Sequence, residues 1–401
     1  MSSSAASYCL TWHSKISDIP QADWDRLALP LKTPFLEWSW LHNLEVSGSA
    51  VPKTGWLPKH LALWRKHPDP LQGRILVAAA PLYLKSHSYG EFVFDQEWAE
   101  VSYQMGVNYY PKLLGMTPFT PAEGYQFLMD PAEPAAEMMG AMVGAIDDFC
   151  AHNRIQGCHF LFVDPGWQQQ MEPLGFIPWL HHSYVWNNQN YGTFESYLGD
   201  FNANQRRNIK RERKALAKAG LHLEVLTGEE IPAEFYDRMH HFYDDTCSKF
   251  MWGSKYLTRQ FFLNLASSFA DRVVLISAVH QDAPHTPVGM SFCLRKGDRF
   301  YGRYWGSVKE IDCLHFNACY YKPIEWAIDQ GIQQFDPGAG GRHKKRRGFP
   351  ATPNTSLHRF YHPKLRRVFE QYIPEINRME QRQIAAINQN LPFRFETQPG
   401  I

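Results

Sequence analysis

Residues 19–27 read IPQADWDRL, and residues 231–239 repeat the pattern as IPAEFYDRM. Four of the nine positions are identical, and Trp/Tyr and Leu/Met preserve the character of two more. An amphipathic, aromatic-rich stretch follows each copy, at residues 35–44 and 256–265, and indicates a helix. One short match can arise by chance, so the order of the elements that follow decides whether the chain is duplicated.

That order repeats. Each half continues with a strand-like run, then two paired strands, then a helix and a final strand. In the first half these are residues 60–64, 78–85 paired with 91–94, 135–153 and 158–164. In the second half they are residues 272–279, 288–295 paired with 299–305, 316–330 and 332–336. Lys296-Gly297-Asp298 predicts a hairpin turn, and Pro323 should kink its helix or mark a start there. The sequence therefore predicts a mixed α/β (α+β) fold made of two similar domains.

Composition excludes several classes of protein. The chain has 401 residues, enough for two or three domains, and 44% of them are hydrophobic, which is typical of a packed protein. A net charge of +1 gives no global attraction to nucleic acid or membrane. Seven Cys without a CxxC pair disfavour a disulfide framework and a zinc site. The first ten residues lack Lys and Arg, and the longest apolar run, residues 75–84, is too short for a bilayer. We therefore expect a cytoplasmic protein without a transmembrane segment.

One stretch near mid-chain is strongly basic. Residues 205–218 carry seven Lys or Arg against Glu212 alone, a net charge of +6. Asn202 or Asn204 can cap a helix here and Gly220 can end it, while Ile209 and Leu216 offer only a narrow apolar seam. We expect a connector helix at 201–220 between domains at 1–200 and 221–390, with a tail at 391–401. Its cations available to a partner are Arg206, Arg207, Lys210 and Arg211.

The most informative motif is DPGAGGRHKKRRGF at residues 336–349. Its glycines allow positive φ and close approach to a ligand, and five cations follow within six residues. Backbone amides beside Lys and Arg suit a phosphate or pyrophosphate, whereas a solvated basic loop is the plainer alternative. The passage RFYGRYWG at residues 299–306 either lines a cleft with Arg303 or packs at the edge of the core.

Other constellations are weaker. His240, His241, Asp244 and Asp245 have metal-compatible spacing, but a solvated helix face is far commoner and no metal is expected. Cys313, His315 and Cys319 lack a group that would orient the His for nucleophilic catalysis. No GxSxG motif is present. The run Lys85-Ser86-His87-Ser88 lacks a third partner.

Taken together, the motifs resemble the FemAB-like predicted N-acyltransferases of bacteria, labelled peptidoglycan biosynthesis/recognition proteins, which belong to the acyl-CoA N-acyltransferase (GNAT) superfamily. The matching segments cover roughly residues 34–360. In the first half they are Pro34–Leu36, Thr54–Trp56 with Pro58, Pro81–Phe94 with Trp98, Tyr109–Leu113 and Pro118–Pro121. From the basic stretch onward they are Arg207–Arg213, Tyr301–Gly306, Leu314–Phe316, Cys319–Tyr321, His343–Lys344 and Arg347–Phe349.

The resemblance implies tandem GNAT-like domains, each with a mixed, mostly antiparallel sheet flanked by helices. It implies direct attack of an amine on an activated acyl carbonyl, with nearby donors stabilising the oxyanion. The residues that it assigns to catalysis are Arg303, Tyr304, His315, Asn317 and Asp336. Those that it assigns to substrate or phosphate binding are Gly338, Gly340, Gly341, His343, Lys344 and Arg347.

Two departures from the family pattern affect these assignments. Family members have Glu where this chain has Asn317 and Arg342, so a base supplied by either Glu is missing. A CoA-binding loop of the QxxGxG/A type is also missing after Trp305, which weakens CoA as the donor and leaves aminoacyl-tRNA or an acyl carrier protein open. The alternative is a non-catalytic binder of RNA or of a phosphate-bearing glycan precursor, with tRNA as a partner. Oligomeric state, donor and acceptor stay open.

Overall fold

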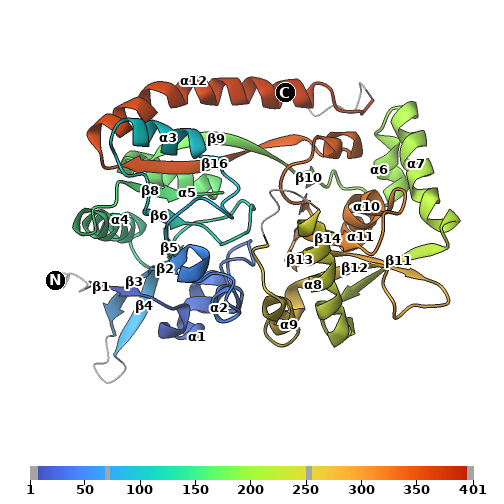
Figure 1. Cartoon of the computed structure of the whole chain (residues 1–401), viewed down its shortest axis with the longest axis horizontal. Helices are drawn as coiled ribbons and strands as arrows, with labels where there is room; N and C mark the ends of the chain where they lie inside the picture. Colours follow the sequence, from blue (N-terminus) through green and yellow to red (C-terminus); the bar gives the residue numbers. More distant parts are fainter. Residues whose placement is uncertain (1–7, 68–72, 250–254, 395–401) are drawn as a thin grey trace. The chain divides into compact units, whose positions relative to one another are not determined.

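The computed structural model describes residues 8–67, 73–249 and 255–394 (Figure 1). The chain forms two compact units: unit 1 is Met1–His181 with Asn354–Arg378, and unit 2 is His182–Pro353 with Met379–Ile401. The basic helix therefore packs as part of unit 2. Compact packing is a different property from independent folding, so the domain limits expected at residues 200, 220 and 390 stay a prediction.

Unit 1 contains two sheets, with strand orders β1-β3-β4-β7 and β2-β5-β6-β8-β16-β9. Its strands are β1 Tyr8–His13, β2 Trp56–Pro58, β3 His60–Lys66, β4 Arg74–Ala80, β5 Leu82–Lys85, β6 Lys112–Gly115, β7 Leu128–Met129 and β8 Gly157–Phe160. Its helices are α1 Gln21–Ala28, α2 Trp38–Val46, α3 Gln96–Gln104, α4 Ala135–His152 and α5 Pro165–Met171. The limits between the units fall within β9 Ile177–Tyr184, β16 Ala351–Phe360 and α12 Pro363–Asn388.

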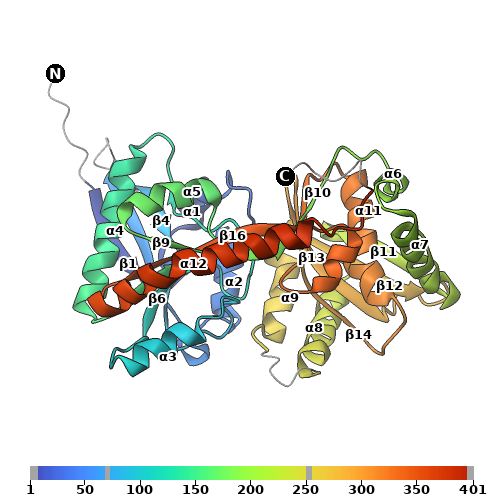
Figure 2. The same cartoon turned by 90° about the horizontal axis from the view of Figure 1, so that it is seen from above.

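Unit 2 has one six-stranded sheet with the order β10-β15-β14-β13-β12-β11. Its strands are β10 Trp186–Asn187, β11 Leu221–Thr227, β12 Val273–His280, β13 Gly289–Lys296, β14 Arg299–Ser307 and β15 Gln334–Asp336. Its helices are α6 Phe194–Gly199, α7 Ala203–Lys218, α8 Ala233–Ser248, α9 Arg259–Ser268, α10 Leu314–Phe316 and α11 Lys322–Asp329. Helix α8 contacts β13 and β14, and α7 lies beside α6 (Figures 1 and 2).

The repeated order of elements is confirmed except for the strand expected at residues 91–94, whose place is taken by β6. Pro20 and Pro232 stand immediately before α1 and α8, so both copies of the repeat begin a helix. In each unit a first strand pairs antiparallel with the strand after two helices, β1 with β3 and β11 with β12. Two further antiparallel steps follow, and then a helix leads to a parallel pair, β6 with β8 in unit 1 and β14 with β15 in unit 2. The two halves thus share one mixed, mostly antiparallel plan.

The halves differ most between their paired strands. In unit 2, Lys296 lies opposite Arg299 and the tight turn has Gly297 at φ 54°, as the hairpin prediction requires. In unit 1 the corresponding pair is Lys85 opposite Lys112, and residues 86–111 form a long insertion between them. The strand expected at residues 91–94 is wrong, because these residues run as irregular chain that carries carboxylates back to the sheet.

Two expected helices form, with the predicted residues at their ends. Helix α7 begins at Asn202, whose side chain accepts from the Gln205 backbone N–H at 3.0 Å, and Gly220 follows it at φ 70°. Ile209 and Leu216 are its buried residues, which confirms the narrow seam. The helix expected at residues 316–330 is built from α10, a π-helical segment at Asn317–Tyr321, and α11, whose first turn contains Pro323.

Candidate functional site

The predicted glycine-rich loop begins where β15 ends. Asp336 lies opposite Tyr301 in the parallel ladder, at the carboxyl end of β15, where α/β sheets commonly bind ligands. Its Oδ1 accepts from the Gly338 backbone N–H at 2.7 Å, and its Oδ2 lies 3.1 Å from Nη2 of Arg303. Gly338 is buried with φ 92°, a conformation that favours glycine. The structure therefore brings two of the predicted catalytic residues together at the mouth of the loop.

Lys344 points inward and holds this loop. Its side chain is 2% exposed, and Nζ donates to the carbonyl oxygens of Gly338 at 2.6 Å and of Ala339 at 3.1 Å. Burial lowers the pKa of the Lys344 ammonium to about 8, although the nearby Asp336 carboxylate opposes the shift. In this structure the lysine binds the loop's own backbone.

Arg347 is likewise used internally. Its guanidinium lies 3.0 Å from Oε2 of Glu212, donates to the His343 carbonyl at 2.9 Å, and stacks 3.4 Å from the centre of the Phe316 ring. The Tyr321 hydroxyl also donates to Glu212. The lone acid of the basic helix thus fastens α7 to the loop and to the π-helical segment.

The remaining predicted catalytic residues lie in packed surroundings. The His315 ring lies tilted against Trp305, with the ring centres 4.9 Å apart, and burial lowers its pKa to about 4, so its imidazole is neutral at ordinary pH. Asn317 donates from Nδ2 to the backbone carbonyls of Glu212 and Cys313, both at 2.9 Å. Tyr304 is half-buried against Tyr243, and burial raises its pKa. These contacts give Asn317 a clear structural role, and the catalytic roles of all three stay a prediction.

Other predicted binding residues face outward to differing degrees. Gly340 and Gly341 are exposed, at φ 63° and 88°. Nε2 of His343 lies 2.7 Å from the Tyr320 hydroxyl. On α7, Arg207, Lys210 and Arg211 are exposed and Arg206 is half-buried, and Lys210 pairs with Glu195 at 2.8 Å. Among the residues that the structure describes, no group of three His, Cys, Asp or Glu side chains could hold a metal ion.

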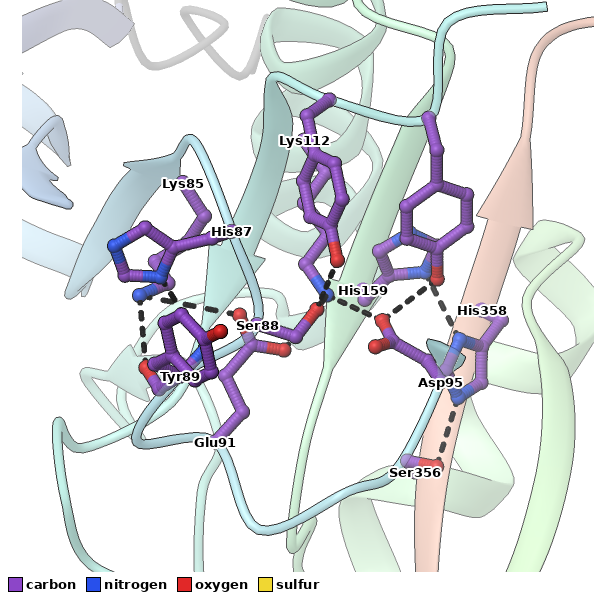
Figure 3. Close-up of polar contacts among 12 residues, drawn as sticks. Lys85, His87, Ser88, Tyr89, Glu91, Asp95, Lys112, His159, Ser356 and His358 are labelled. Atoms are coloured by element: carbon purple, nitrogen blue, oxygen red, sulfur yellow. Dashed lines mark hydrogen bonds and ion pairs between the residues drawn. The ribbon is translucent and has the colours of Figure 1, made fainter. Parts of the chain in front are cut away.

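A second constellation, in unit 1, was missed by sequence reasoning (Figure 3). Lys112, at the start of β6, is 1% exposed, and its Nζ lies 2.7 Å from Oε2 of Glu91 and 2.5 Å from Oδ2 of Asp95. Tyr109 also donates to Asp95 at 2.7 Å. Both carboxylates come from the 86–111 insertion, which is thereby fixed to the sheet. We call these four residues with Lys85 the unit 1 charge cluster.

Lys85 completes the cluster from the neighbouring strand. Its Nζ donates to the Tyr89 carbonyl at 3.2 Å, lies 3.6 Å above the Trp56 ring, and is 4.0 Å from Oε1 of Glu91. That Glu91 oxygen is buried without a hydrogen-bond partner in the structure. The prediction that the run Lys85–Ser88 lacks a third catalytic partner stays a prediction, and the contacts of Lys85 itself are with Glu91 and the Tyr89 carbonyl.

The electrostatics of the cluster favour proton exchange near neutral pH. Burial raises the pKa of Glu91 to about 7, against the opposing pull of Lys112. Burial lowers the pKa of Lys85 to about 7, against the opposing pull of Glu91. Asp95 keeps a lowered pKa because the attraction and hydrogen bond of Lys112 outweigh its desolvation, and the pKa of Lys112 is raised by the two carboxylates despite burial. Lys112 and Asp95 thus form a stable ion pair beside a pair that titrates.

The cluster is connected to the surface by two hydroxyl groups. Nζ of Lys112 donates to Ser88 Oγ at 2.8 Å, and Ser88 Oγ lies 2.7 Å from the hydroxyl of Tyr110. Ser88 and Tyr110 are both half-buried, whereas Glu91 is fully buried. A continuous hydrogen-bond chain therefore runs from the Glu91 carboxylate through Lys112 and Ser88 to the hydroxyl of the half-buried Tyr110.

The same region contains a buried histidine layer. His159 on β8 and His358 on β16 are paired in register, with their Nδ1 atoms 2.9 Å apart. Nε2 of His358 lies 2.8 Å from Ser356 Oγ. Burial lowers the pKa of both imidazoles well below the ordinary value, so both stay neutral. This layer extends the polar surroundings of the cluster without adding charge.

The sequence contained a signal for this site. Lys85 and Lys112 end and begin short apolar strands, LYLK and KLLG, and both lie in segments that carry the family resemblance. A lysine at a strand end usually extends its ammonium into water, which made the pair appear ordinary. The acids that pair with these lysines are Glu91, six residues after Lys85, and Asp95, seventeen residues before Lys112. No local pattern links groups so spaced.

Comparison with known proteins identifies the family. A sequence model of the FemAB-like family, described as peptidoglycan biosynthesis/recognition, matches residues 15–395. The chain belongs to the FemAB-like family. A search of curated proteins found no match for this FemAB-like chain. No described helix combines bilayer-spanning length with an apolar sequence.

Solved structures support the fold. FemX is 11% identical with a TM-score of 0.52, over 88% of this chain and 98% of FemX. The C-terminal domain of a putative lysylphosphatidylglycerol synthetase from Agrobacterium fabrum is 8% identical with a TM-score of 0.51, over 88% and 95%. A tandem GNAT protein from the clavulanic acid biosynthesis pathway is 12% identical with a TM-score of 0.44, over 89% and 99%. The FemAB-like chain thus shares the fold of FemX and of the synthetase domain, and identities this low show the fold alone.

Replacing Lys344 with Met should destabilise the protein. The Gly338 and Ala339 carbonyls would lose their buried donor, which should lower the free energy of unfolding by about 1–3 kcal/mol. Urea denaturation measures this loss. Arg346→Ala, at an exposed neighbour, is the matched control and should stay within about 0.5 kcal/mol of wild type. Equal stability of the two variants would contradict the internal role of Lys344.

Glu91→Gln should destabilise more at about pH 5 than at about pH 7. Because the Glu91 pKa rises from an ordinary 4.5 to about 7 on folding, the folded protein holds a proton between these values that the unfolded chain releases. This stabilisation is present at low pH and is lost as the pH rises through about 7. Gln lacks it, so the deficit against wild type should grow by about 1–3 kcal/mol on acidification. Urea denaturation at both pH values checks this, with exposed Glu97→Gln as the control; a deficit independent of pH would refute the shifted pKa.

Proposed function

We propose that this FemAB-like protein is an N-acyltransferase that moves an activated acyl or aminoacyl group onto an amine of a cell-wall-related acceptor. The family description supports a role in peptidoglycan biosynthesis, and the tandem GNAT-like fold is compatible with acyl transfer. The observation that carries the proposal is the hydrogen-bond chain from Glu91 through Lys112 and Ser88 to Tyr110. We propose the cytoplasm as its location, where thiols stay reduced.

The hydrogen bonds from Glu91 to Tyr110 would carry the proton transfer that the reaction needs. An amine is nucleophilic only without its extra proton, and most amines carry that proton at neutral pH. The Lys112 ammonium, which has no lone pair, would first give an N–H proton to Glu91. The transient neutral amine would then take a proton from Ser88, Ser88 one from the Tyr110 hydroxyl, and Tyr110 the proton of the substrate amine, so that Lys112 ends as an ammonium and Glu91 as a carboxylic acid. A Glu91 pKa of about 7 suits this task, because a base works best near the operating pH.

The chemical step itself then balances simply. The neutral amine nitrogen bonds to the acyl carbon, the carbon–sulfur or carbon–oxygen bond of the donor breaks, and the departing thiolate or alkoxide takes up the released proton. No acyl-enzyme is required. We retain Arg303 and Asp336, at the carboxyl end of β15, as proposed substrate-contacting residues.

The donor is proposed only by class: acyl-CoA, aminoacyl-tRNA or an acyl carrier protein. The exposed cations of α7, Arg207, Lys210, Arg211, Lys214 and Lys218, favour an RNA-bearing donor. The same surface supports the second candidate, a non-catalytic binder of RNA. A phosphate-bearing glycan precursor is the other ligand of that alternative.

Ser88→Ala and Tyr110→Phe should each slow transfer by at least tenfold, and by up to about 10²–10⁴-fold if the chain is the main route for the proton. Each change removes one hydroxyl and leaves the ion pairs of Lys112 with Glu91 and Asp95 in place. The assay offers acetyl-CoA and aminoacyl-tRNA to a nucleotide-linked peptidoglycan precursor that carries a free amine, and mass spectrometry detects the amide product.

Ser86→Ala is the matched control, since Ser86 is exposed and lies two residues before Ser88. It should keep wild-type turnover. In wild type, kcat/KM should rise with pH as Glu91 loses its proton near pH 7. Full turnover by both hydroxyl variants would exclude the relay, and amide formation with neither donor class would leave the binder as the better reading.

RNA binding by α7 is tested by salt dependence. Unacylated tRNA should bind wild type with log Kd rising linearly with log salt concentration, and Arg207→Gln and Arg211→Gln should each reduce the slope by about one. Lys309→Gln, an exposed lysine elsewhere in unit 2, should leave the slope unchanged. A flat salt curve would remove RNA as donor and as ligand.

A further inference from the structure

The cations at residues 342–347 lie on a short 3₁₀ helix, and its geometry sorts them into three rows. In a 3₁₀ helix the side chains at i and i+3 align, because a turn takes three residues. Lys344 and Arg347 form the buried row that was described above. Arg342 and Lys345 form a second row, and His343 and Arg346 a third. The sequence RHKKRR therefore presents one pair of cations to the core and a different pair outward.

The second row lines a cavity of about 280 Å³ within unit 2. Its lining residues are Tyr184, Arg342, Lys345, Gln383, Ala386 and Ile387. Four of these carry hydrogen-bond donors, two are apolar, and none is a carboxylate. The cavity therefore has a formal charge of +2 and an apolar wall on the face of α12.

These donors have no partners elsewhere among the residues that the structure describes. Neither Arg342 nor Lys345 forms an ion pair there, in contrast to Arg347 and Lys210. Tyr184 is 4% exposed, lines the cavity, and makes no hydrogen bond through its hydroxyl within the described chain. Burial raises the pKa of the Tyr184 hydroxyl, and the charge of the nearby Arg342 guanidinium opposes that shift. A tyrosine hydroxyl without a protein partner and two uncompensated cations around one small space are the features of an anion site.

We propose that this cavity binds a phosphate monoester, with the phosphate held by Arg342, Lys345 and Tyr184 and the organic group packed on Ala386 and Ile387. A phosphate dianion matches the two positive charges, whereas a carboxylate would leave one uncompensated. Guanidinium can grip two phosphate oxygens at once while the ammonium acts as a point charge. Binding here does not depend on the proposed transfer reaction, since it uses none of the unit 1 residues.

The site differs from the phosphate site expected from the sequence. That expectation placed the contacts on Lys344 and Arg347, whose donors serve the loop backbone and Glu212. The inferred site uses their neighbours and adds Tyr184 and Gln383, which lie far away in the sequence. It also gives a role to Arg342, the position at which the chain departs from the family's Glu.

Ligand-observed NMR titration of the full chain with phenyl phosphate tests the proposal. Wild type should bind phenyl phosphate more tightly than inorganic phosphate, which lacks the apolar group, and more tightly than benzoate, which carries one charge. Arg342→Gln and Lys345→Gln should each weaken phenyl phosphate binding by about tenfold or more. Tyr184→Phe should weaken it less, since it removes one neutral donor.

Arg346→Gln is the matched control, because it removes an equal charge from the third row of the same helix. It should leave the affinity within about twofold of wild type, and thermal unfolding should show all variants folded. Equal weakening by Arg346→Gln and Arg342→Gln would overturn the site in favour of general surface charge. Benzoate binding as tight as phenyl phosphate would overturn the phosphate assignment. The Ser88→Ala variant should bind phenyl phosphate normally, so failure of this proposal and failure of the transferase proposal are separable.

Discussion

A buried ammonium needs counter-charges, and that requirement at Lys112 shapes unit 1. Desolvating one isolated charge costs several kcal/mol, so an unpaired Lys112 would not remain charged at this position. Glu91 and Asp95 supply the compensation, and both arrive on the 86–111 insertion. The path of that insertion is therefore dictated by the need to bring two carboxylates to one nitrogen. Removing either acid would leave charge uncompensated, which is more damaging than never having had the pair.

The two units show how one order of elements accommodates two different arrangements of buried charge. Lys85 and Lys112 occupy the positions of Lys296 and Arg299, yet only the first pair is separated by a long insertion. The segments that follow the last parallel strand differ in the opposite way, since the longer addition is in unit 2. After β8, Asp164-Pro165-Gly166 leads directly into α5, with Asp164 capping the helix at 2.9 Å from the Gly166 nitrogen. After β15, the same Asp-Pro-Gly turn leads instead into glycines and cations. Unit 1 therefore carries its added segment before its pair of parallel strands, and unit 2 carries its added segment after that pair.

The sequence predicted those features of the fold that depend on interactions within a few residues. The helix at Ala135–His152, the hairpin at Gly297, the cap at Asn202 and the break near Pro323 follow from periodicity, turn chemistry and capping within a few residues. The role of Lys344 could not be read in this way. Lys344 and Lys345 are adjacent and chemically identical, and only the three-residue turn of the helix sends one to the core and the other to a cavity.

The unit 1 site escaped prediction for a related reason. An apolar strand that ends in lysine gives no sign of burial, since burial depends on acids whose separation in sequence follows no periodicity. What distinguishes Lys85 from Lys112 is the balance of desolvation against neighbours: one carboxylate at 4.0 Å cannot keep Lys85 fully charged, whereas two within hydrogen-bond distance keep Lys112 charged. Glu91 belongs to both environments, since its Oε2 pairs with Lys112 and its Oε1 lies 4.0 Å from Nζ of Lys85. One shared carboxylate therefore couples the ion pair that fixes the insertion to a lysine whose pKa is lowered to about 7, so the two lysines form one network rather than two independent sites.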